Sequence, residues 1–321
     1  SSDLLDGVGR LMGSRADLQA LRDAGAELSF FVAPLRSPLK GRTNLRNHRK
    51  MLLADADAVA DPRQARLWCG GRNLAAEYFD GMPGHTPWRD LSFDVRGDIV
   101  RQGMALFEHD WAFAMLRRLP TPPWQMLATA PAAPLTFGTQ AAPEAPLGTP
   151  RTPDTHGTPG PPVEPRAQLI ASGPDQVEDT LQAMFISAAY RARSRLRIAT
   201  PYFVPDTALL SALTLAARRG VRIELLLPAR SNHRLSDLAR RRALRSLHAA
   251  GGELWLAPQM LHAKLVVVDD ELALAGSANL DGRSLLINYE LMMAFHDRDA
   301  IAAFTRWFDD ERAPAAICKI G

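Results

Sequence analysis

The chain carries the same pattern of His, Lys and Asp twice. In each copy a Lys lies two residues after the His and an Asp five residues after the Lys: His48, Lys50 and Asp55, then His262, Lys264 and Asp269. Strand residues alternate between faces, so the His and the Lys of each set point the same way. One such stretch would be an ordinary strand with a solvated end. Two copies with both spacings matched indicate a duplicated functional motif, and these six residues are the catalytic candidates.

A turn containing Gly and Asn follows each set, GGRN at Gly70–Asn73 and GSAN at Gly276–Asn279. If the two sets meet across a pseudo-two-fold axis, two Lys and two Asn side chains surround one anionic centre. A phosphate diester carries its charge on two non-bridging oxygens, and such donors stabilise that charge as it grows in the transition state. We therefore predict a phosphodiester site in which Asn73, Ser277 and Asn279 bind the substrate.

Two histidines suit a double displacement at phosphorus. One attacks the phosphorus atom, and the other protonates the leaving oxygen and then acts as base on the incoming hydroxyl. Each reactive ring nitrogen must be aimed, so the other ring nitrogen needs a partner. We expect Glu290 to orient His262. Asp90, in the WRD stretch, is the comparable candidate for His48, and an ordinary surface carboxylate is the alternative for each acid.

Metal binding is the competing use of His and Asp side chains. The chain contains no HExxH, no CxxC and no acidic cluster of the kind that binds hard ions. A lysine two residues from each motif His would also repel a bound cation. We therefore expect no metal and no other cofactor.

The composition places few limits on the partner. The 321 residues suffice for two domains, 46% of them are apolar, the net charge is +3 and the sequence pI is about 9.1. This mildly basic balance suits anionic partners and does not select among membrane surfaces, nucleic acids and phosphate esters. The two cysteines, Cys69 and Cys318, form no disulfide framework and favour a reducing compartment. Cys69 is expected to be a small buried hydrophobe.

A proline-rich segment divides the chain. Residues 120–165 hold 13 of the 24 prolines and cannot bury enough apolar surface to offset their ordering entropy. We therefore predict a first half at 1–119, a linker at 120–166 and a second half at 167–321. Strands alternate with helices in the second half, which predicts an α/β fold with a mixed, mostly parallel sheet covered by helices. The active site would lie at the interface of two such halves.

The first half matches only the later part of the second. Its helix at Ser14–Gly25 and the strand ELSFFVAP resemble the helix ending in AAGG and the strand ELWLAP, and LLDGV takes the place of ELLLPA. Nothing in the first half matches residues 175–203. We therefore expect the given chain to begin part-way through its first domain. Apolar surface would then be exposed around the first leucines of the chain, Leu4, Leu5 and Leu11.

Two basic stretches favour a membrane surface. Residues 28–54 contain six Lys or Arg side chains and no acid, and the helix near Arg240–Arg245 presents a second basic face. Anionic headgroups attract such residues by about 1 kcal/mol each near the surface. A solvated helix face is the alternative for the second stretch. The longest charge-free run, 119–143, is interrupted by prolines and predicts no membrane-spanning helix.

These motifs resemble those of the phospholipase D superfamily, and within it those of bacterial cardiolipin synthases. The matching stretches cover most of the chain outside the linker: RNHRK (46–50), GGRN (70–73), EYF (77–79), WRD (88–90), DW (110–111), SGPD (172–175), TPYFVPD (200–206), HAK (262–264), GSANLDGRS (276–284) and NYE (288–290). The resemblance implies two pseudo-symmetric domains and transfer of a phosphatidyl group to a His, with glycerol released and a phosphatidylglycerol hydroxyl as acceptor. It also implies His48 as nucleophile and His262 as general acid and base.

The partner implied by this resemblance is an anionic phospholipid, phosphatidylglycerol, at a membrane surface. The expected location is peripheral, on the cytoplasmic side of a bacterial inner membrane, and nucleic acid is not expected as a partner. A phosphodiesterase of the same superfamily, which hydrolyses lipid or nucleic acid, remains open because the motifs do not define the acceptor. A catalytically inactive lipid-binding or scaffold protein is a third interpretation, against which two intact motifs argue.

Overall fold

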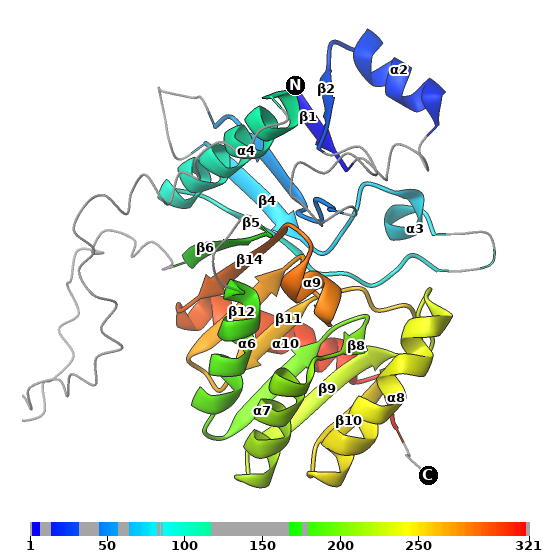
Figure 1. The fold of residues 1–321 in the computed structure, drawn as a ribbon, viewed down its shortest axis with the longest axis vertical. Coiled ribbons are helices and arrows are strands. Elements are labelled where there is room, and N and C mark those ends of the chain that lie inside the picture. The colour runs from blue at the N-terminus through cyan, green and yellow to red at the C-terminus, as the bar shows by residue number, and fades with distance from the viewer. Residues whose placement is uncertain are drawn as a thin grey trace, which may run out of the picture.

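The computed structural model of the chain describes residues 2–6, 14–31, 45–56, 64–81, 84, 86–116, 167–174 and 179–318. These residues form two halves stacked one above the other (Figure 1). The predicted linker lies outside the described residues, as do many of the basic residues in 28–54. Within the described ranges, no helix is both long and apolar enough to cross a membrane.

The second half is built on one eight-stranded sheet with the order β15-β10-β9-β7-β11-β12-β14-β6. Its strands are β6 (Ala167–Ser172), β7 (Arg195–Ala199), β9 (Arg222–Pro228), β10 (Glu253–Ala257), β11 (Leu265–Val268), β12 (Leu272–Gly276), β14 (Glu290–Phe295) and β15 (Ala316–Ile317). Two short strands, β8 (Phe203–Val204) and β13 (Leu280–Asp281), pair separately.

The strand directions correct one expectation. The mixed α/β class is confirmed, but only β7–β9 and β9–β10 are parallel neighbours in the large sheet, so it is not mostly parallel. Parallel neighbours need a crossover, usually a helix. Only α7 (Thr207–Arg218) and α8 (Arg234–Ala249) provide such crossovers, whereas a short turn joins β11 to β12.

Helices cover both faces of this sheet. α6 (Thr180–Arg191), α7 and α8 pack on one face, and α10 (Arg298–Arg312) packs on the other (Figure 1). On β11, Val266 and Val268 face the three-helix side, while Leu265 and Val267 face the α10 side. A continuous apolar run is the pattern of a strand buried on both faces, and the motif His lies just ahead of this fully buried strand.

The first half contains two smaller sheets. β1 (Ser2–Leu5) and β2 (Glu27–Phe30) are parallel neighbours that flank α2 (Arg15–Asp23) in the chain. The second sheet is antiparallel and consists of β3 (Met51–Ala54), β4 (Arg66–Gly70) and β5 (Ser92–Val95). It packs on the long helix α4 (Asp98–Leu116). Two short helices complete the part of the chain that the structure describes, α3 (Ala76–Phe79) and, in the second half, α9 (Gly282–Leu286).

The strand pairing follows the internal repeat. The β1–α2–β2 unit has the pairing of β9–α8–β10, and β3–β4 has that of β11–β12. No strand among the described first-half residues corresponds to β7, which joins β9 to β11 in the second half. The first-half strands that match β9, β10, β11 and β12 therefore lie in two separate sheets, whereas those four strands of the second half lie in one. Leu4 and Leu5 are half-buried, so the expected exposure is only partial there, and Leu11 lies outside the described residues.

The boundary between the halves is packed like the inside of a domain. One apolar cluster joins Leu67, Cys69 and Leu91 of the first half to side chains of β11, β12, β14 and α10. Cys69 Sγ lies 3.4 Å from Met293 Sδ, and burial raises the pKa of this thiol to about 12. Cys69 is therefore the buried hydrophobe that the sequence predicts, and the two halves form one packed unit.

Candidate active site

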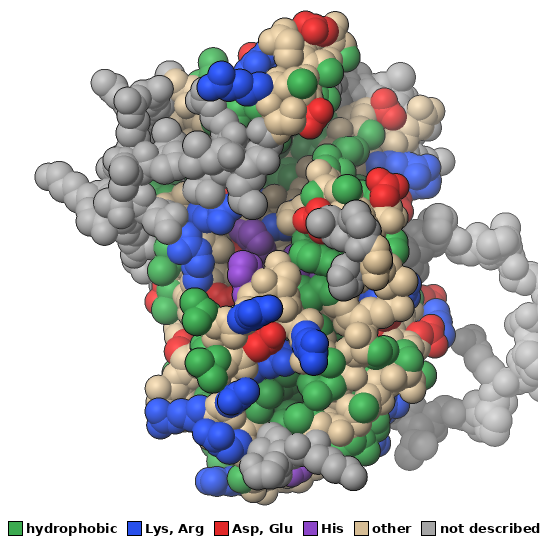
Figure 2. Space-filling view, turned by 90° about the vertical axis from the view of Figure 1, so that its right-hand side faces the viewer, with side chains coloured by type: hydrophobic (Ala, Val, Ile, Leu, Met, Phe, Trp, Pro, Cys, Tyr) green, Lys and Arg blue, Asp and Glu red, His purple; other side chains and the backbone are tan. Residues whose placement is uncertain are grey.

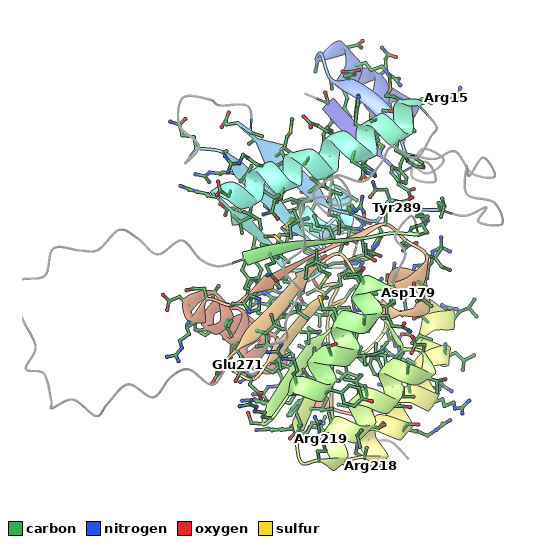
Figure 3. The ribbon with its side chains drawn as sticks, turned by 60° about the vertical axis from the view of Figure 1, so that its left-hand side comes forward. Arg15, Asp179, Arg218, Arg219, Glu271 and Tyr289 are labelled. Atoms are coloured by element: carbon green, nitrogen blue, oxygen red, sulfur yellow. The ribbon has the colours of Figure 1, made fainter. Side chains whose placement is uncertain are left out.

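The two motif strands meet at the boundary through matching backbone contacts. The His48 N–H donates to Tyr289 O at 2.8 Å, and the His262 N–H donates to Arg89 O at 2.6 Å. Both contacts belong to parallel bridges between the halves, and Figure 3 shows Tyr289 at this boundary. In each half, the residue just ahead of the acid therefore holds the His of the other half.

This crossing decides the partner of each His. His48 Nδ1 lies 2.9 Å from both carboxylate oxygens of Glu290, and His262 Nδ1 lies 2.8 Å from Asp90 Oδ2. The expectation from sequence has the two acids the other way round and is wrong. The bridges carry each carboxylate to the His of the opposite half. Because the Nδ1 of His48 is held by an acid, its Nε2 is the nitrogen left to react.

Close backbone packing aligns the two Gly-and-Asn turns residue by residue. A Cβ added at Gly70 would lie 2.3 Å from Leu91 O, and one added at Gly276 would lie 2.2 Å from Leu291 O. Only glycine allows so close an approach at these two positions. The following turn residues then align in pairs, Gly71 with Ser277 and Asn73 with Asn279.

The two His–acid dyads differ in what holds the carboxylate. Ser277 Oγ donates to Glu290 Oε2 at 2.5 Å and accepts from the backbone N–H that follows Glu290. At the matching place Gly71 has no hydroxyl, and Asp90 Oδ1 accepts directly from the next backbone N–H at 2.7 Å. Glu290 with Ser277 and Asp90 with Gly71 are thus the matching pairs in the two dyads. In one pair a longer acid is combined with a serine, and in the other a shorter acid is combined with a glycine. Ser277 supports Glu290 here, where the sequence predicts a contact with substrate.

Both acids are ionised and both histidines are neutral at pH 7. Burial alone would raise the pKa of Asp90 and Glu290, but the adjacent His and Lys side chains lower both values. Burial, with the charge of Lys264, lowers the pKa of His262 to about 3. Burial also lowers the pKa of His48, although Glu290 opposes that shift. Each dyad in the free protein is therefore a carboxylate facing a neutral imidazole.

Both motif lysines are buried beside their histidines. Lys50 Nζ donates to His48 O at 2.6 Å. Lys264 Nζ donates to His262 O and lies 3.1 Å from His262 Nε2. Burial lowers the pKa of Lys50 to about 7 and that of Lys264 to about 8. An anion bound between these lysines would raise both pKa values, because it favours the charged form.

Aromatic side chains that sequence reasoning missed surround His262. Tyr78 OH lies 3.3 Å from His262 Nδ1 and accepts from Asn73 Nδ2 at 3.0 Å. The ring centroids of Trp88 and Tyr202 lie 5.7 and 6.4 Å from that of His262. The available signal was that all three rings fall inside the EYF, WRD and TPYFVPD stretches. Asn73 therefore reaches the site through Tyr78.

Asn279 has the features of a substrate-binding side chain. It is buried, and its Oδ1 has no hydrogen-bond partner among the described residues. A buried amide oxygen without a partner is costly. A hydroxyl on a bound molecule would satisfy it, as the sequence-based prediction requires.

The motif aspartates lie away from the dyads. Asp55 and Asp269 follow the ends of β3 and β11 that are farther from the histidines, and both have positive φ, 53° and 49°. The Asp269 carboxylate accepts from three successive backbone N–H groups of residues 193–195. The assignment of both residues as catalytic is therefore corrected. Aspartate tolerates the left-handed conformation and bonds nearby backbone, so these residues shape the strand ends.

A buried ion pair braces the His48 strand. Arg49 Nη1 lies 2.5 Å from both carboxylate oxygens of Asp110 on α4, and Arg49 Nε donates to Glu290 O at 3.2 Å. The second motif has Ala263 at the matching place. Only the first motif therefore has this ion pair, and Arg49 ties the His48 strand to the backbone of Glu290, the acid that contacts His48.

The basic stretches differ from what the sequence predicts. Of the described residues in 28–54, Arg46 pairs with Asp6 at 2.6 Å, and Arg49 and Lys50 are buried as described. Arg49 and Lys50 are therefore not available to a membrane surface, whereas the Arg46 side chain is 36% exposed beside Asp6. In α8, Arg240 is buried against backbone carbonyls. The exposed arginines of that helix are Arg234, Arg241, Arg242 and Arg245.

The site opens on one face of the molecule. Figure 2 shows histidine side chains in a recess at mid-height, with Lys and Arg side chains close by. The His48 side chain is 24% exposed and that of His262 only 6%. Crossed dyads, buried lysines and a repeated fold define a class of protein: two α/β halves that share one site at their pseudo-symmetric boundary.

Comparison with known proteins shows which sequences the chain resembles. Residues 185–312 match the family model described as "Cardiolipin synthase, PLD-like domain". Cardiolipin synthase A of Pseudomonas putida is 33% identical over 92% of this chain and 53% of its own length, and cardiolipin synthase 2 of Bacillus cereus is 31% identical over 96% and 53%. The chain thus spans about half the length of these relatives. Its second half thus matches the model of that family, and most of the chain is similar in sequence to cardiolipin synthases.

A solved structure shares the fold. The phosphatidylserine synthase of Haemophilus influenzae superposes with a TM-score of 0.57 at 14% identity, covering 86% of this chain and 64% of that one. This likeness concerns the fold alone, and it includes both halves of the present chain.

Proposed function

We propose that the protein transfers a phosphatidyl group between alcohols, in the manner of a cardiolipin synthase. The observation that carries this proposal is the pair of crossed dyads, in which each His is held at Nδ1 by an ionised acid from the other half. The similarity to cardiolipin synthases supports a phospholipid substrate. The donor would be phosphatidylglycerol, and the acceptor a hydroxyl of a second phosphatidylglycerol.

In the first step, His48 Nε2 attacks phosphorus and the bond from phosphorus to the glycerol oxygen breaks. His262 gives its proton to that oxygen, and glycerol leaves. Lys50 and Lys264 stabilise the charge on the non-bridging oxygens. The donor phosphate also offsets the charge of Lys264, which is one cause of the low pKa of His262. Substrate binding therefore favours the protonated ring that the step requires.

In the second step, the acceptor hydroxyl attacks the phosphatidyl-histidine. His262 takes the hydroxyl proton, the bond from phosphorus to His48 breaks, and both rings return to their starting state. Asn279, with its unpaired buried Oδ1, can accept from a hydroxyl of either alcohol. This reaction would take place at a bacterial membrane surface, and its cytoplasmic side stays a prediction.

The test is a product assay with vesicles of phosphatidylglycerol. We expect cardiolipin and glycerol in equal amounts, and no loss of activity with EDTA. Within the described ranges, no group of three or more His, Cys, Asp or Glu side chains could hold a metal ion. His48→Ala should abolish the products, and His248→Ala, an exposed His of α8, is the matched control. Phosphatidic acid in place of cardiolipin would identify a hydrolase instead.

A further inference from the structure

The most exposed large apolar side chains of the described residues lie beside the site. Leu235 is 83% exposed and Leu74 is 81%, and the next, Ile317, is 62%. Leu74 directly follows Asn73, whose amide bonds Tyr78 at His262. Leu235 follows the segment of Asn232 and His233, both of which contact Tyr202. One such leucine therefore comes from each half, and each adjoins a segment that contacts the rings around His262.

Other exposed apolar side chains extend this pair into a rim. Phe79 is 50% exposed and adjoins Tyr78, and Arg72 lies over its ring at 5.2 Å. Leu238 is 58% exposed and lies one turn after Leu235 on α8. α3 and the first turn of α8 lie on the same side of the molecule (Figure 1). Single exposed leucines are normal, whereas a group of them around a site indicates a binding surface.

The outward face of α8 adds positive charge to this rim. Its exposed side chains at helical spacing are Arg234, Leu238, Arg241 and Arg245. The one acid of the helix, Asp237, is turned back and accepts from the Ser231 N–H at 3.0 Å. Arginines keep their charge in water while their stems lie along apolar surface. A helix face that mixes Leu and Arg suits the boundary of an anionic bilayer.

We propose that this rim is a docking face for an anionic phospholipid bilayer, with Leu74 and Leu235 inserted on opposite sides of the site. The inference rests on the proposed function, because it takes the substrate to be a membrane lipid. The phosphate of such a lipid must reach His48 while its acyl chains stay in the bilayer. That is possible only if the mouth of the recess faces the membrane, where the two most exposed leucines lie.

Vesicle sedimentation with the full chain tests the docking face without any turnover. Leu74→Ser combined with Leu235→Ser should weaken binding to phosphatidylglycerol–phosphatidylcholine vesicles by about tenfold or more. Tyr190→Ser with Leu215→Ser is the matched control, because both are exposed near Arg218 and Arg219, at the far end of the second half (Figure 3). Arg241→Gln with Arg245→Gln should weaken binding only to vesicles that contain phosphatidylglycerol, and mainly at low salt.

Equal binding by the leucine variant and its control would overturn the proposal. So would a change of oligomeric state in the leucine variant with vesicle binding intact, since a second copy of the chain would then occupy the face. The proposed function fails separately, if wild-type protein binds vesicles but forms no transfer product. Where it does turn over, the leucine variant should lose more activity on vesicles than on short-chain phosphatidylglycerol below its micelle concentration, and equal losses would contradict docking.

Discussion

The His48–Glu290 dyad is open and braced, whereas the His262–Asp90 dyad is enclosed by rings. A serine hydroxyl holds Glu290, and the Arg49–Asp110 ion pair holds its backbone. Tyr78, Trp88 and Tyr202 surround the His262 ring instead. The two dyads share backbone geometry because of the internal repeat. The side chains around them differ, and this difference gives the two histidines different surroundings.

The separation suits the proposed roles. A nucleophile must reach phosphorus, and His48 has the more exposed ring. A proton-transfer group benefits from a site that excludes water, and His262 is almost fully enclosed. Burial and Lys264 lower the pKa of His262 to about 3, so the ring becomes an acid for the leaving oxygen only when the charge of a bound phosphate favours its protonated form.

Removing each His should separate the dyads most clearly. We expect His48→Ala and His262→Ala to lower phosphatidylglycerol turnover by about 10⁴-fold each. A phosphatidyl ester of p-nitrophenol has a leaving group that needs no proton. With that ester, His262→Ala should regain a burst of nitrophenolate in stopped-flow measurements, and His48→Ala should not. A burst from His48→Ala alone would reverse the roles.

The acids should follow the crossed pairing. Glu290→Gln and Asp90→Asn should each cost about 10²–10³-fold, because the ring loses the carboxylate that fixes its tautomer. The nitrophenyl ester should rescue Asp90→Asn and leave Glu290→Gln impaired. The opposite rescue pattern would show that the acids serve the histidines of their own halves. Ser246→Ala, at a half-buried position of α8, provides a control for expression and handling.

The pH profile should report the buried lysines. Lys50, with a pKa of about 7, and Lys264, with a pKa of about 8, lose their protons as pH rises. The fall of kcat/KM with rising pH should therefore steepen above about pH 7–8, by about a further factor of ten per pH unit where one lysine controls it. The acid limb should lie below pH 6.5, because the pKa of His48 is lowered from that value. Lys50→Arg, which stays charged, should move the alkaline limb upward, and an unchanged limb would exclude Lys50 as its source.

The smallest effect on chemistry should come from the motif aspartates. Asp269→Ala should lower the free energy of unfolding by about 1–3 kcal/mol, because it leaves the backbone N–H groups of 193–195 without their acceptor. Activity per folded molecule should change by less than about threefold, since the residue touches neither dyad. Denaturant unfolding and an active-site titration measure the two quantities. A fully folded, inactive Asp269→Ala protein would restore its catalytic role.

The sequence predicts the members of the site better than their arrangement. Duplicated spacing is a local pattern, so His48, Lys50, His262 and Lys264 could be found by inspection. The acids were also within reach, but their pairing depends on the bridges at Tyr289 and Arg89, which join distant parts of the chain. The residues near each motif do not indicate which half of the chain supplies the bridging residue.

Two other differences have equally physical origins. Asp269 keeps fixed spacing to the His because it ends the same short strand, and its φ of 49° shows why that position favours aspartate. Spacing alone cannot distinguish a residue kept for chemistry from one kept for a turn. The mostly antiparallel sheet follows from which strands have helical crossovers, whereas an alternating pattern indicates only that strands and helices are present.

The most direct test of the central claim is to trap the covalent intermediate. The His262→Ala protein is mixed with the nitrophenyl ester, quenched at alkaline pH where a phosphoramidate survives, digested and analysed by mass spectrometry. We predict a phosphatidyl group on the peptide that contains His48, and none when Glu290→Gln is added. In the wild-type protein, a phosphatidyl group on His262 and none on His48 would contradict the assignment of the open dyad as the nucleophile.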